Sequence, residues 1–482
     1  MNRLGLGSKL GYGLGQAAEG LKTGAFEYIL FFYYVQVLGL SGTLSGAALL
    51  VAMIADAVTD PLVASISDNH RSRLGRRHPF IYGSAIPMAF FFVVVFLPPD
   101  GLGQLGLFLW LAGFSILVRV AMTFCVIPHL ALGAELSSDY DERTTIVAYR
   151  TFFLITSMSA VVPLSFWLFF GASDAYPNGQ LDPAAYGPFA SVLALLMVFA
   201  IVGTGVGTHG RIPHLPQPSR APEAFTLSRV VIDVVESLKN ISFRWFFLGM
   251  FLYSIARGTQ NALNVHMFTF FWQLAPEAIA TWGTAVLIGS TAGIFVWAHV
   301  AKYLSKKYTY ISGLVLWTCC MSLPPLAHLL GFFPAHESRF FLPLLAVFGG
   351  LAMFFKGSQI TSGSMLADIA DEHEITTGRR QEGMFFGALS FSSKASSGLG
   401  HLIAGLMLDL IQFPTDAVPG SVPEELLRNL ALVYGPAVLI LVFMACYAIS
   451  RYSLTRDQLV EIQERLRAGR TTAIRGQGSQ RT

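Results

Sequence analysis

The sequence predicts an all-α membrane protein with 12 transmembrane helices in two six-helix bundles. The chain has 482 residues, of which 53% are hydrophobic and only 13% are charged, whereas soluble domains carry about 25% charged residues. Twelve apolar runs are long enough to cross a bilayer, which takes about 20 residues each. One long polar stretch divides these runs into six and six. A polytopic membrane protein is therefore expected rather than a soluble chain of several domains.

The expected spans follow one another with short connections. They lie near 11–38, 45–67, 80–98, 104–133, 146–170, 187–208, 243–272, 279–300, 310–333, 340–367, 384–411 and 428–450. The proline-rich stretch at 209–242 is typical of a linker with a short amphipathic helix. The predicted organisation is an N-terminal bundle at 1–208, a cytoplasmic linker at 209–242, a C-terminal bundle at 243–453 and a cytoplasmic tail at 454–482.

Basic residues mark one side of the predicted membrane. They concentrate in the connections after the even-numbered spans, as in RSRLGRR at 71–77, and are almost absent from the other connections. Positively charged loops stay on the cytoplasmic side, so both termini are predicted to be cytoplasmic. Arg73, Arg76 and Arg77 are candidates for gating or bracing contacts with acidic turns of the neighbouring half and with anionic membrane lipids. A pure topology signal is the alternative.

A weak internal repeat supports two related halves. The second span of each half ends in a basic turn, SDNHRSRLGRRHP at 67–79 and AKYLSKKYTY at 301–310. The fourth span of each half ends in an acid-rich turn, GAELSSDYDERT at 133–144 and LADIADEHEITTGRR at 366–380. Two similar six-helix halves around a cavity at the membrane midplane are typical of secondary transporters.

Two acids stand in the middle of the second apolar run. Asp56 and Asp60 lie one helical turn apart in LVAMIADAVTDPLVASI, so both carboxylates project from one helix face. An acid at the bilayer centre costs roughly 2.5 to 3.5 kcal/mol on insertion scales. Two acids held close cannot both stay ionised without a cation between them or a proton on one. The pair therefore predicts a buried site for a cation or a proton.

Few other charges fall within the expected spans, namely Glu19, Lys22, Glu27, Arg119, Arg150, Arg257, Lys356 and Lys394. Several of them can reach water from a span end, and Lys394, like Asp56 and Asp60, is among the least able to do so. A buried lysine keeps its charge only beside a carboxylate. We expect a network of Asp56, Asp60, Arg150 and Lys394 across a cavity, whose charge balance changes when a cation binds. A static brace of ion pairs between helices is the alternative. His129, which follows a proline in the fourth span, is a candidate protonatable group or a hydrogen-bonded core histidine.

The motifs of enzymes and of cofactor sites are not found in the sequence. There is no nucleophile–base pair, no phosphate-binding loop and no metal-ligand spacing. The four cysteines lie in apolar stretches and are not spaced with histidines as in a zinc site. We therefore expect neither an enzyme nor a cofactor, and no binding of nucleic acid.

With these residues in hand, the chain resembles the glycoside–pentoside–hexuronide:cation symporters of the major facilitator superfamily, the family of melibiose permease. The resemblance covers most of the chain. The motifs that carry it are KLGYGLGQ at 9–16, ADAVTDP at 55–61, RSRLGRRHPF at 71–80, IPHLALGAEL at 127–136, DERT at 141–144, YR at 149–150 and ADIADEHE at 367–374, followed by the Lys394 segment. The resemblance implies the major facilitator fold and alternating access, with a solute and a cation moved together.

Several site residues follow from the resemblance position by position. Asp56 and Asp60 match the family's cation-binding acids, and Thr123 matches a threonine that assists them. Arg150 matches an arginine near the sugar, and Lys394 matches the lysine of span 11 that lies between the two sites.

The sequence also departs from melibiose permease. Val126 replaces a third acid in span 4, and Leu130 replaces an aromatic residue. Gly20 replaces an acid of span 1 that contacts sugar, with Glu19 one place earlier as the candidate substitute. The lost acids and ring argue against a galactoside of the melibiose type. Because sodium needs several hard oxygen ligands, they also favour H⁺ as the coupling ion, with Na⁺ as the alternative.

The expected function is cation-coupled symport of a small-molecule sugar or glycoside by a monomer in a bacterial inner membrane. A lysolipid-like amphiphile is the alternative solute, because the pocket is less polar than that of melibiose permease. A sensor, scramblase or structural protein with a transporter fold is the alternative from a different class. Uphill accumulation in vesicles separates transport from these, since a sensor binds its solute without concentrating it.

Overall fold

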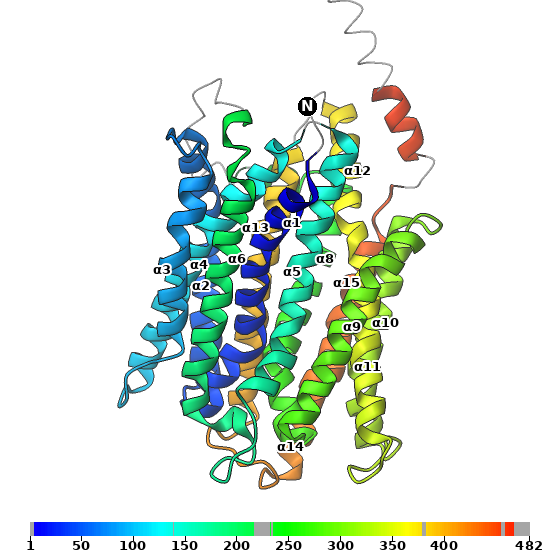
Figure 1. Ribbon diagram of the computed structural model, residues 1–482. Helices are drawn as coiled ribbons and strands as arrows, with labels where there is room; N and C mark the ends of the chain where they lie inside the picture. The colour runs from blue at the N-terminus through cyan, green and yellow to red at the C-terminus, as the bar shows by residue number, and fades with distance from the viewer. Residues whose placement is uncertain are drawn as a thin grey trace, which may run out of the picture.

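The computed structural model describes residues 4–137, 139–215, 232, 235–377, 382–454 and 458–466. Within these ranges the chain is helical and contains no β-strand. Twelve helical segments appear at the predicted spans and run roughly along one direction (Figure 1). The all-α, two-bundle architecture expected from the apolar runs is confirmed.

The N-terminal half contains the first six segments. They are α1 (Leu6–Gly24) with its π-helical continuations η1 (Ala25–Leu30) and η2 (Tyr33–Val37), α2 (Gly42–Asn69), α3 (His78–Val95), α4 (Gln104–Glu135), α5 (Tyr140–Leu168) and α6 (Tyr186–His209).

The C-terminal half contains the other six segments. They are α8 (Ile241–His266) with the π-helical segment η6 (Met267–Phe271), α9 (Pro276–Val300), α10 (Lys306–Leu329), α11 (Phe341–Lys356) continuing through η7 (Gly357–Ile360) into α12 (Thr361–Thr377), α13 (Glu382–Leu410), and α14 (Glu424–Leu432) continuing through η8 (Val433–Ala437) into α15 (Val438–Ser450).

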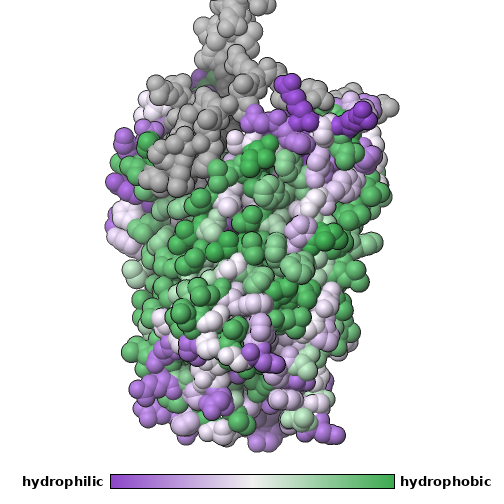
Figure 2. Space-filling view, turned by 90° about the vertical axis from the view of Figure 1, so that its left-hand side faces the viewer, coloured by the Kyte–Doolittle hydropathy of each residue, from purple (hydrophilic) through white to green (hydrophobic). Residues whose placement is uncertain are grey.

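An apolar band covers the middle of one face of the molecule. Figure 2 shows green side chains over the middle of one face and purple ones toward both ends. By length and composition, nine helices of the described chain are apolar enough to cross a membrane, some of them joined from two segments. The segments that fall short are α1, α8 and α13. They pack on one another, since α8 contacts both α13 and η1, the continuation of α1. Their polar side chains therefore point to the interior and supply the contacts described below.

The starts of α2, α5, α8 and α10 carry a side chain that caps free backbone N–H groups. Ser41 caps α2 by accepting from Leu44 N, and Asn240 caps α8 by accepting from Phe243 N at 2.7 Å. The N-terminus and the last described helix, at 458–466, lie at the same end of the bundle, here called the terminal end (Figure 1). The opposite end holds the start of α2 and the end of α13.

The two halves meet tightly at the opposite end. A Cβ added to Gly42 of α2 would lie 2.6 Å from the carbonyl oxygen of Gly405 of α13, and one added to Gly46 would lie 2.6 Å from the Cα of Leu402. Only glycine allows such an approach. Asp409 of α13 accepts hydrogen bonds from the backbone N–H of Gly42 at 2.9 Å and from that of Thr43 at 2.8 Å. This α2–α13 seam closes that end between the halves.

The predicted linker and tail are described only in part. Of the linker at 209–242, residues 216–231 and 233–234 lie outside the described ranges, so the short helix expected there is described only at 232 and 235–237, which are helical. In the tail, Leu459 and Ile462 pack on the hydrophobic core of the C-terminal half. The short tail helix therefore covers protein at the terminal end.

Candidate functional site

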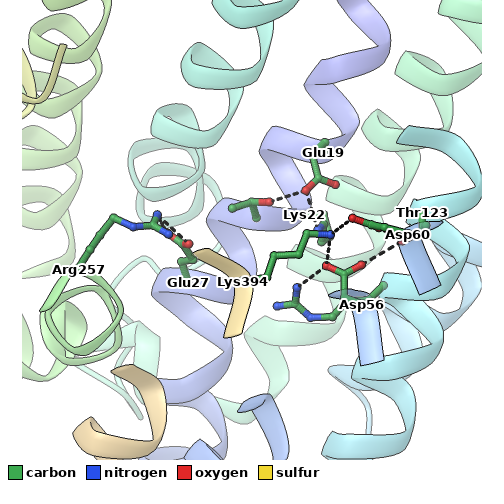
Figure 3. A network of polar contacts seen from close by, with 10 residues as sticks. Glu19, Lys22, Glu27, Asp56, Asp60, Thr123, Arg257 and Lys394 are labelled. Carbon is green, nitrogen blue, oxygen red and sulfur yellow. Dashed lines mark hydrogen bonds and ion pairs between the residues drawn. The ribbon is translucent and has the colours of Figure 1, made fainter. Parts of the chain in front are cut away.

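The two acids of α2 face the opposite half of the molecule. Lys394 of α13 lies between them, with its Nζ 3.0 Å from Asp56 Oδ2 and 2.6 Å from Asp60 Oδ2 (Figure 3). The hydroxyl of Thr123 on α4 lies 3.0 Å from Asp56 Oδ1 and 3.3 Å from Asp60 Oδ1. Asp56, Asp60 and Lys394 were expected in one network from the sequence, and Thr123 beside the acids from the family resemblance. The structure brings these four residues together. We call them the acid-pair site.

Arg119 completes the charge balance of this site. Its Nη1 lies 3.4 Å from Asp56 Oδ2, and its guanidinium lies over the ring of Phe26 with 5.4 Å to the ring centroid. Arg119 and Thr123 are one turn apart on α4, as Asp56 and Asp60 are on α2, so two helix faces meet. Two carboxylates thus face two cations, and the site is neutral with Lys394 in place.

Access to the site is uneven. The side chain of Asp56 is 8% exposed, that of Asp60 is 21% exposed and that of Lys394 is 30% exposed. Asp56 is therefore the inner acid and Asp60 the outer one. A small cation that enters meets Asp60 and Lys394 first, and its charge is felt strongly because the surrounding medium is far less polar than water.

Glu19 lies beside the acid-pair site but is already paired. Its Oε1 accepts from Lys22 Nζ at 2.9 Å and from the Thr23 hydroxyl at 3.1 Å, within α1 itself (Figure 3). Lys22 is also close enough to Asp56 to interact with it electrostatically. The carboxylate of Glu19 remains 23% exposed, so a role toward a solute stays a prediction.

Arg150 does not join the acid-pair site. Within the described ranges Arg150 forms no ion pair with Asp56 or Asp60. Arg119 lies beside Asp56, in the place where Arg150 was expected. Arg150 lies instead near Tyr12 and His129. The expected four-membered network is corrected accordingly, because α4 is closer to α2 than α5 is.

His129 is held as a structural histidine in this conformation. Its Nε2 lies 2.8 Å from the carbonyl oxygen of Tyr12, and its ring stacks on the Tyr12 ring with 4.3 Å between centroids. Its side chain is buried. Of the two interpretations, the geometry favours the hydrogen-bonded core histidine that joins α4 to α1.

A second charged group bridges the halves and was not proposed as a site from the sequence. Glu27 on η1 accepts from Arg257 Nη1 of α8 at 3.0 Å (Figure 3). It also accepts from Asn261 Nδ2 at 2.7 Å. Both charges stand within predicted spans, but their pairing depends on how α1 and α8 approach each other. The four-residue spacing of Arg257 and Asn261 was the available signal, since it places both on one helix face.

Asn261 of this group lines a small cavity between the halves. The cavity is lined from the N-terminal half by Tyr28 and Ser159, and from the C-terminal half by polar residues that include Gln260, Asn261 and Lys356. It leaves about 20 Å³ for the centres of water molecules, which is room for about one water. The halves must therefore separate here before a sugar-sized molecule fits.

The basic turn between α2 and α3 braces its own half. Glu135 at the end of α4 accepts from Arg76 Nη2 at 2.8 Å and from Arg77 Nη2 at 2.9 Å, and Arg77 also contacts Asp68 at 2.5 Å. Arg73 is exposed. The expectation that these arginines meet acids of the neighbouring half is wrong for the described residues, because the acidic end of α4 lies closer.

The weak sequence repeat has a structural counterpart. In the C-terminal half, Lys306 at the start of α10 contacts Asp368 of α12 at 2.6 Å. The basic turn after the second helix thus binds the acidic end of the fourth helix in both halves. This internal likeness supports two pseudo-symmetric bundles.

Comparison with known proteins places the chain among transporters. A family model described as MFS/sugar transport protein matches residues 11–456. The putative glycoside/cation symporter YagG of Escherichia coli is 26% identical over 97% of this chain and 96% of its own. The isoprimeverose transporter of Lactiplantibacillus pentosus is 24% identical over 83% of this chain and 79% of its own.

Solved structures support the fold. The inward-open xylose transporter XylE from E. coli aligns with a TM-score of 0.58 and 14% identity, over 95% of this chain and 98% of that one. Because the family model spans nearly the whole length and the apolar helices form the expected bundle, the chain belongs to the MFS/sugar transport protein family and is an integral membrane transporter rather than an enzyme.

Proposed function

We propose that this protein imports a sugar or glycoside together with a cation, H⁺ or Na⁺, by alternating access. The observation that carries the proposal is the acid-pair site, where Lys394 of one half occupies the space between Asp56 and Asp60 of the other. Printed names of relatives, a glycoside/cation symporter and an isoprimeverose transporter, support the solute class.

Charge balance explains how a cation acts at this site. With Lys394 and Arg119 present, the two carboxylates are already neutralised. An added cation leaves one positive charge in excess, which is costly in a buried site. Lys394 therefore leaves the carboxylates when H⁺ or Na⁺ arrives, and Thr123 remains as an oxygen ligand beside both acids.

Release of Lys394 couples the cation to the solute. Lys394 is an ion-pair link between the halves beside Asp56 and Asp60, so its departure loosens α13 from α2. A rearranged Lys394 side chain is then free to donate to hydroxyl groups in the widened cavity. By linkage each ligand raises the affinity for the other.

The solute that fits the polar lining is rich in hydroxyl groups. Amide side chains such as Gln260 and Asn261 face the cavity, and amides donate and accept as sugar hydroxyls require. A lysolipid tail would leave such groups unpaired, which costs free energy. We retain both termini on the cytoplasmic side, a bacterial inner membrane with its lipids, and a monomeric carrier as parts of the proposal.

Uptake into proteoliposomes tests the function. The purified protein is reconstituted into vesicles, and candidate sugars and glycosides are added to the external medium. An inward H⁺ gradient, an inward Na⁺ gradient or no gradient is imposed. We expect accumulation above the outside concentration only with one of these gradients. Asp56→Asn is expected to abolish accumulation and to leave solute exchange partly intact, whereas the exposed Asp100→Asn control accumulates normally. Normal gradient-driven accumulation in Asp56→Asn would refute the coupling assignment.

A further inference from the structure

A pocket at the terminal end of the C-terminal half has no part in the cation mechanism. It lies where α9 turns into α10 (Figure 1), between that turn, α12 and the segment that follows α15. It leaves about 510 Å³ for the centres of water molecules, which is within the usual size of small-molecule sites, about 300–1,000 Å³. We call it the basic pocket, and its polar lining comprises Lys302, Ser305, Lys306, Lys307, Asp368 and Tyr452.

Positive charge exceeds negative charge in the basic pocket. Lys306 is neutralised by Asp368, which it contacts at 2.6 Å. The ammonium group of Lys307 donates to the backbone carbonyl oxygen of Tyr452 at 3.0 Å. The ammonium group of Lys302 forms neither a hydrogen bond nor an ion pair with any residue that the structure describes. Three lysines thus line the pocket with one carboxylate.

The corresponding turn of the N-terminal half uses its cations differently. There Glu135 accepts from both Arg76 and Arg77. In the C-terminal half, Lys306 is the one pocket lysine that meets a carboxylate within the described ranges. The second turn therefore keeps two cations that the described acids do not neutralise.

The basic pocket also contains the positive end of a helix. α10 begins at Lys306, directly after the cap residue Ser305, and its first turn carries two lysines and no acid. The backbone N–H groups of Lys306 and Lys307 have no acceptor in the described part of the chain. Lysines are unfavourable at a helix N-terminus, whereas an anion is favoured there by the helix dipole and the free N–H groups.

A buried hydroxyl group in the pocket lacks a hydrogen-bond partner. Tyr452 is only 2% exposed, and its hydroxyl bonds to no other described residue. It is close enough to Asp368, another lining residue, to interact with it electrostatically. Because an unpaired buried hydroxyl costs free energy, a ligand oxygen that accepts from Tyr452 would be stabilised.

We propose that the basic pocket binds the phosphate group of an anionic phosphate ester. Phosphate oxygens accept hydrogen bonds from lysine ammonium groups and from N–H groups at a helix start. The Tyr452 hydroxyl adds a neutral donor. Leu304 and Leu454 line the same pocket and suit the organic part of the ester. The ester is either an anionic lipid headgroup or a soluble phosphorylated compound.

A bound ester would act on the C-terminal half alone. It would link the start of α10 to α12 and to the segment after α15, because all three contribute lining residues. The lining residues of the basic pocket include no member of the acid-pair site. The proposal therefore stands apart from the identity of the coupling ion and of the solute.

Equilibrium binding to the purified full chain tests the proposal and identifies the source of the ester. In the soluble arm, calorimetric titration compares sn-glycerol 3-phosphate with glycerol. In the lipid arm, native mass spectrometry of delipidated protein compares dioleoyl phosphatidylglycerol with zwitterionic dioleoyl phosphatidylcholine. Saturable binding of glycerol phosphate indicates a soluble ester, whereas preferential retention of phosphatidylglycerol alone indicates a lipid headgroup.

Two variants locate the site in whichever arm shows binding. Lys302→Gln is expected to lower the affinity about tenfold or more, as for the loss of a hydrogen bond to a charged group. Tyr452→Phe removes a hydroxyl that has no partner among the described residues, so it should lower the affinity several-fold without lowering the melting temperature. The exposed Lys239→Gln and Tyr176→Phe are the matched controls.

Weaker binding in both pocket variants and in neither control would support the site. Binding in neither arm, or binding that both pocket variants leave unchanged, would overturn it. Neither arm uses an ion gradient, so failure of the basic pocket would leave the proposed transport function intact.

Discussion

Removal of the lysine between the two acids should tighten cation binding. Lys394 donates to Asp60 Oδ2 at 2.6 Å and lies 3.0 Å from Asp56 Oδ2, so an incoming ion must displace it. In Lys394→Gln the acids and Arg119 remain, and the site carries one net negative charge. The substitution thus removes a competitor and leaves an attractive site for a positive ion.

The size of the effect follows from the contacts that are lost. A hydrogen bond to a charged group contributes about 1.5–3 kcal/mol. The side chain of Lys394 is 30% exposed, so solvent weakens its interactions, and we assign this range to the two contacts together rather than to each. The expected gain in cation affinity is therefore about 10- to 150-fold, since about 1.4 kcal/mol is a factor of ten.

Calorimetric titration with NaCl, at ionic strength held constant with choline chloride, measures this gain for Na⁺. Proton uptake by the weakly buffered protein measures the same quantity for H⁺. Lys239→Gln, at an exposed position, is the matched control. Net uphill transport should fall, because the empty carrier loses its internal cation, while exchange between loaded forms continues. Unchanged or weaker cation binding in a folded Lys394→Gln variant would refute the displacement argument.

The remaining predictions concern the contacts that hold each conformation. Asp409→Asn weakens the cap that joins α13 to the start of α2, a contact worth about 0.5–2 kcal/mol. A larger fraction of molecules should then be open at the opposite end, measured as distances between spin labels on α2 and α13. Glu135→Gln removes the carboxylate, 9% exposed, that Arg76 and Arg77 share, and should lower the melting temperature by several degrees. Glu461→Gln, whose ion pair with Arg465 is exposed on both sides, should lower it less, and equal losses would contradict the burial argument. In Gly405→Ala the new methyl group meets the facing backbone of α2 and should impair closure in the same spin-label assay. Gly113→Ala is the control, because no heavy atom lies within 4 Å of its methyl group, and it should leave closure and melting temperature unchanged or slightly improved.

The sequence predicted the bundle and the heart of the acid-pair site for physical reasons. Apolar runs must be helical in a bilayer, and carboxylates one turn apart must share a helix face. Asp56, Asp60 and Lys394 stand too far from the ends of their predicted spans to reach the membrane surface along the helix, so their meeting inside the bundle was expected. Both arguments use the sequence of a single helix and do not require knowledge of which helices are neighbours.

Contacts that depend on which helices are neighbours were harder to predict. Arg119 and Arg150 were both charged residues within spans, and only the packing of α4 against α2 selects Arg119 as the partner of Asp56. The pairing of Glu27 with Arg257 likewise requires the approach of η1 to α8. The π-helical turns of the first span also shift its face, which a regular 3.6-residue period does not reveal.

The glycine contacts between α2 and α13 set how the closed end can part. Gly42, Gly46 and Gly405 bring bare main chain against main chain there. Long interlocked side chains would have to change rotamer one after another before the surfaces slid free, whereas two smooth backbones separate as rigid bodies. Opening there then requires few local rearrangements. The rate of the transport cycle would depend on the few hydrogen bonds, chiefly those accepted by Asp409, that hold the two backbones together.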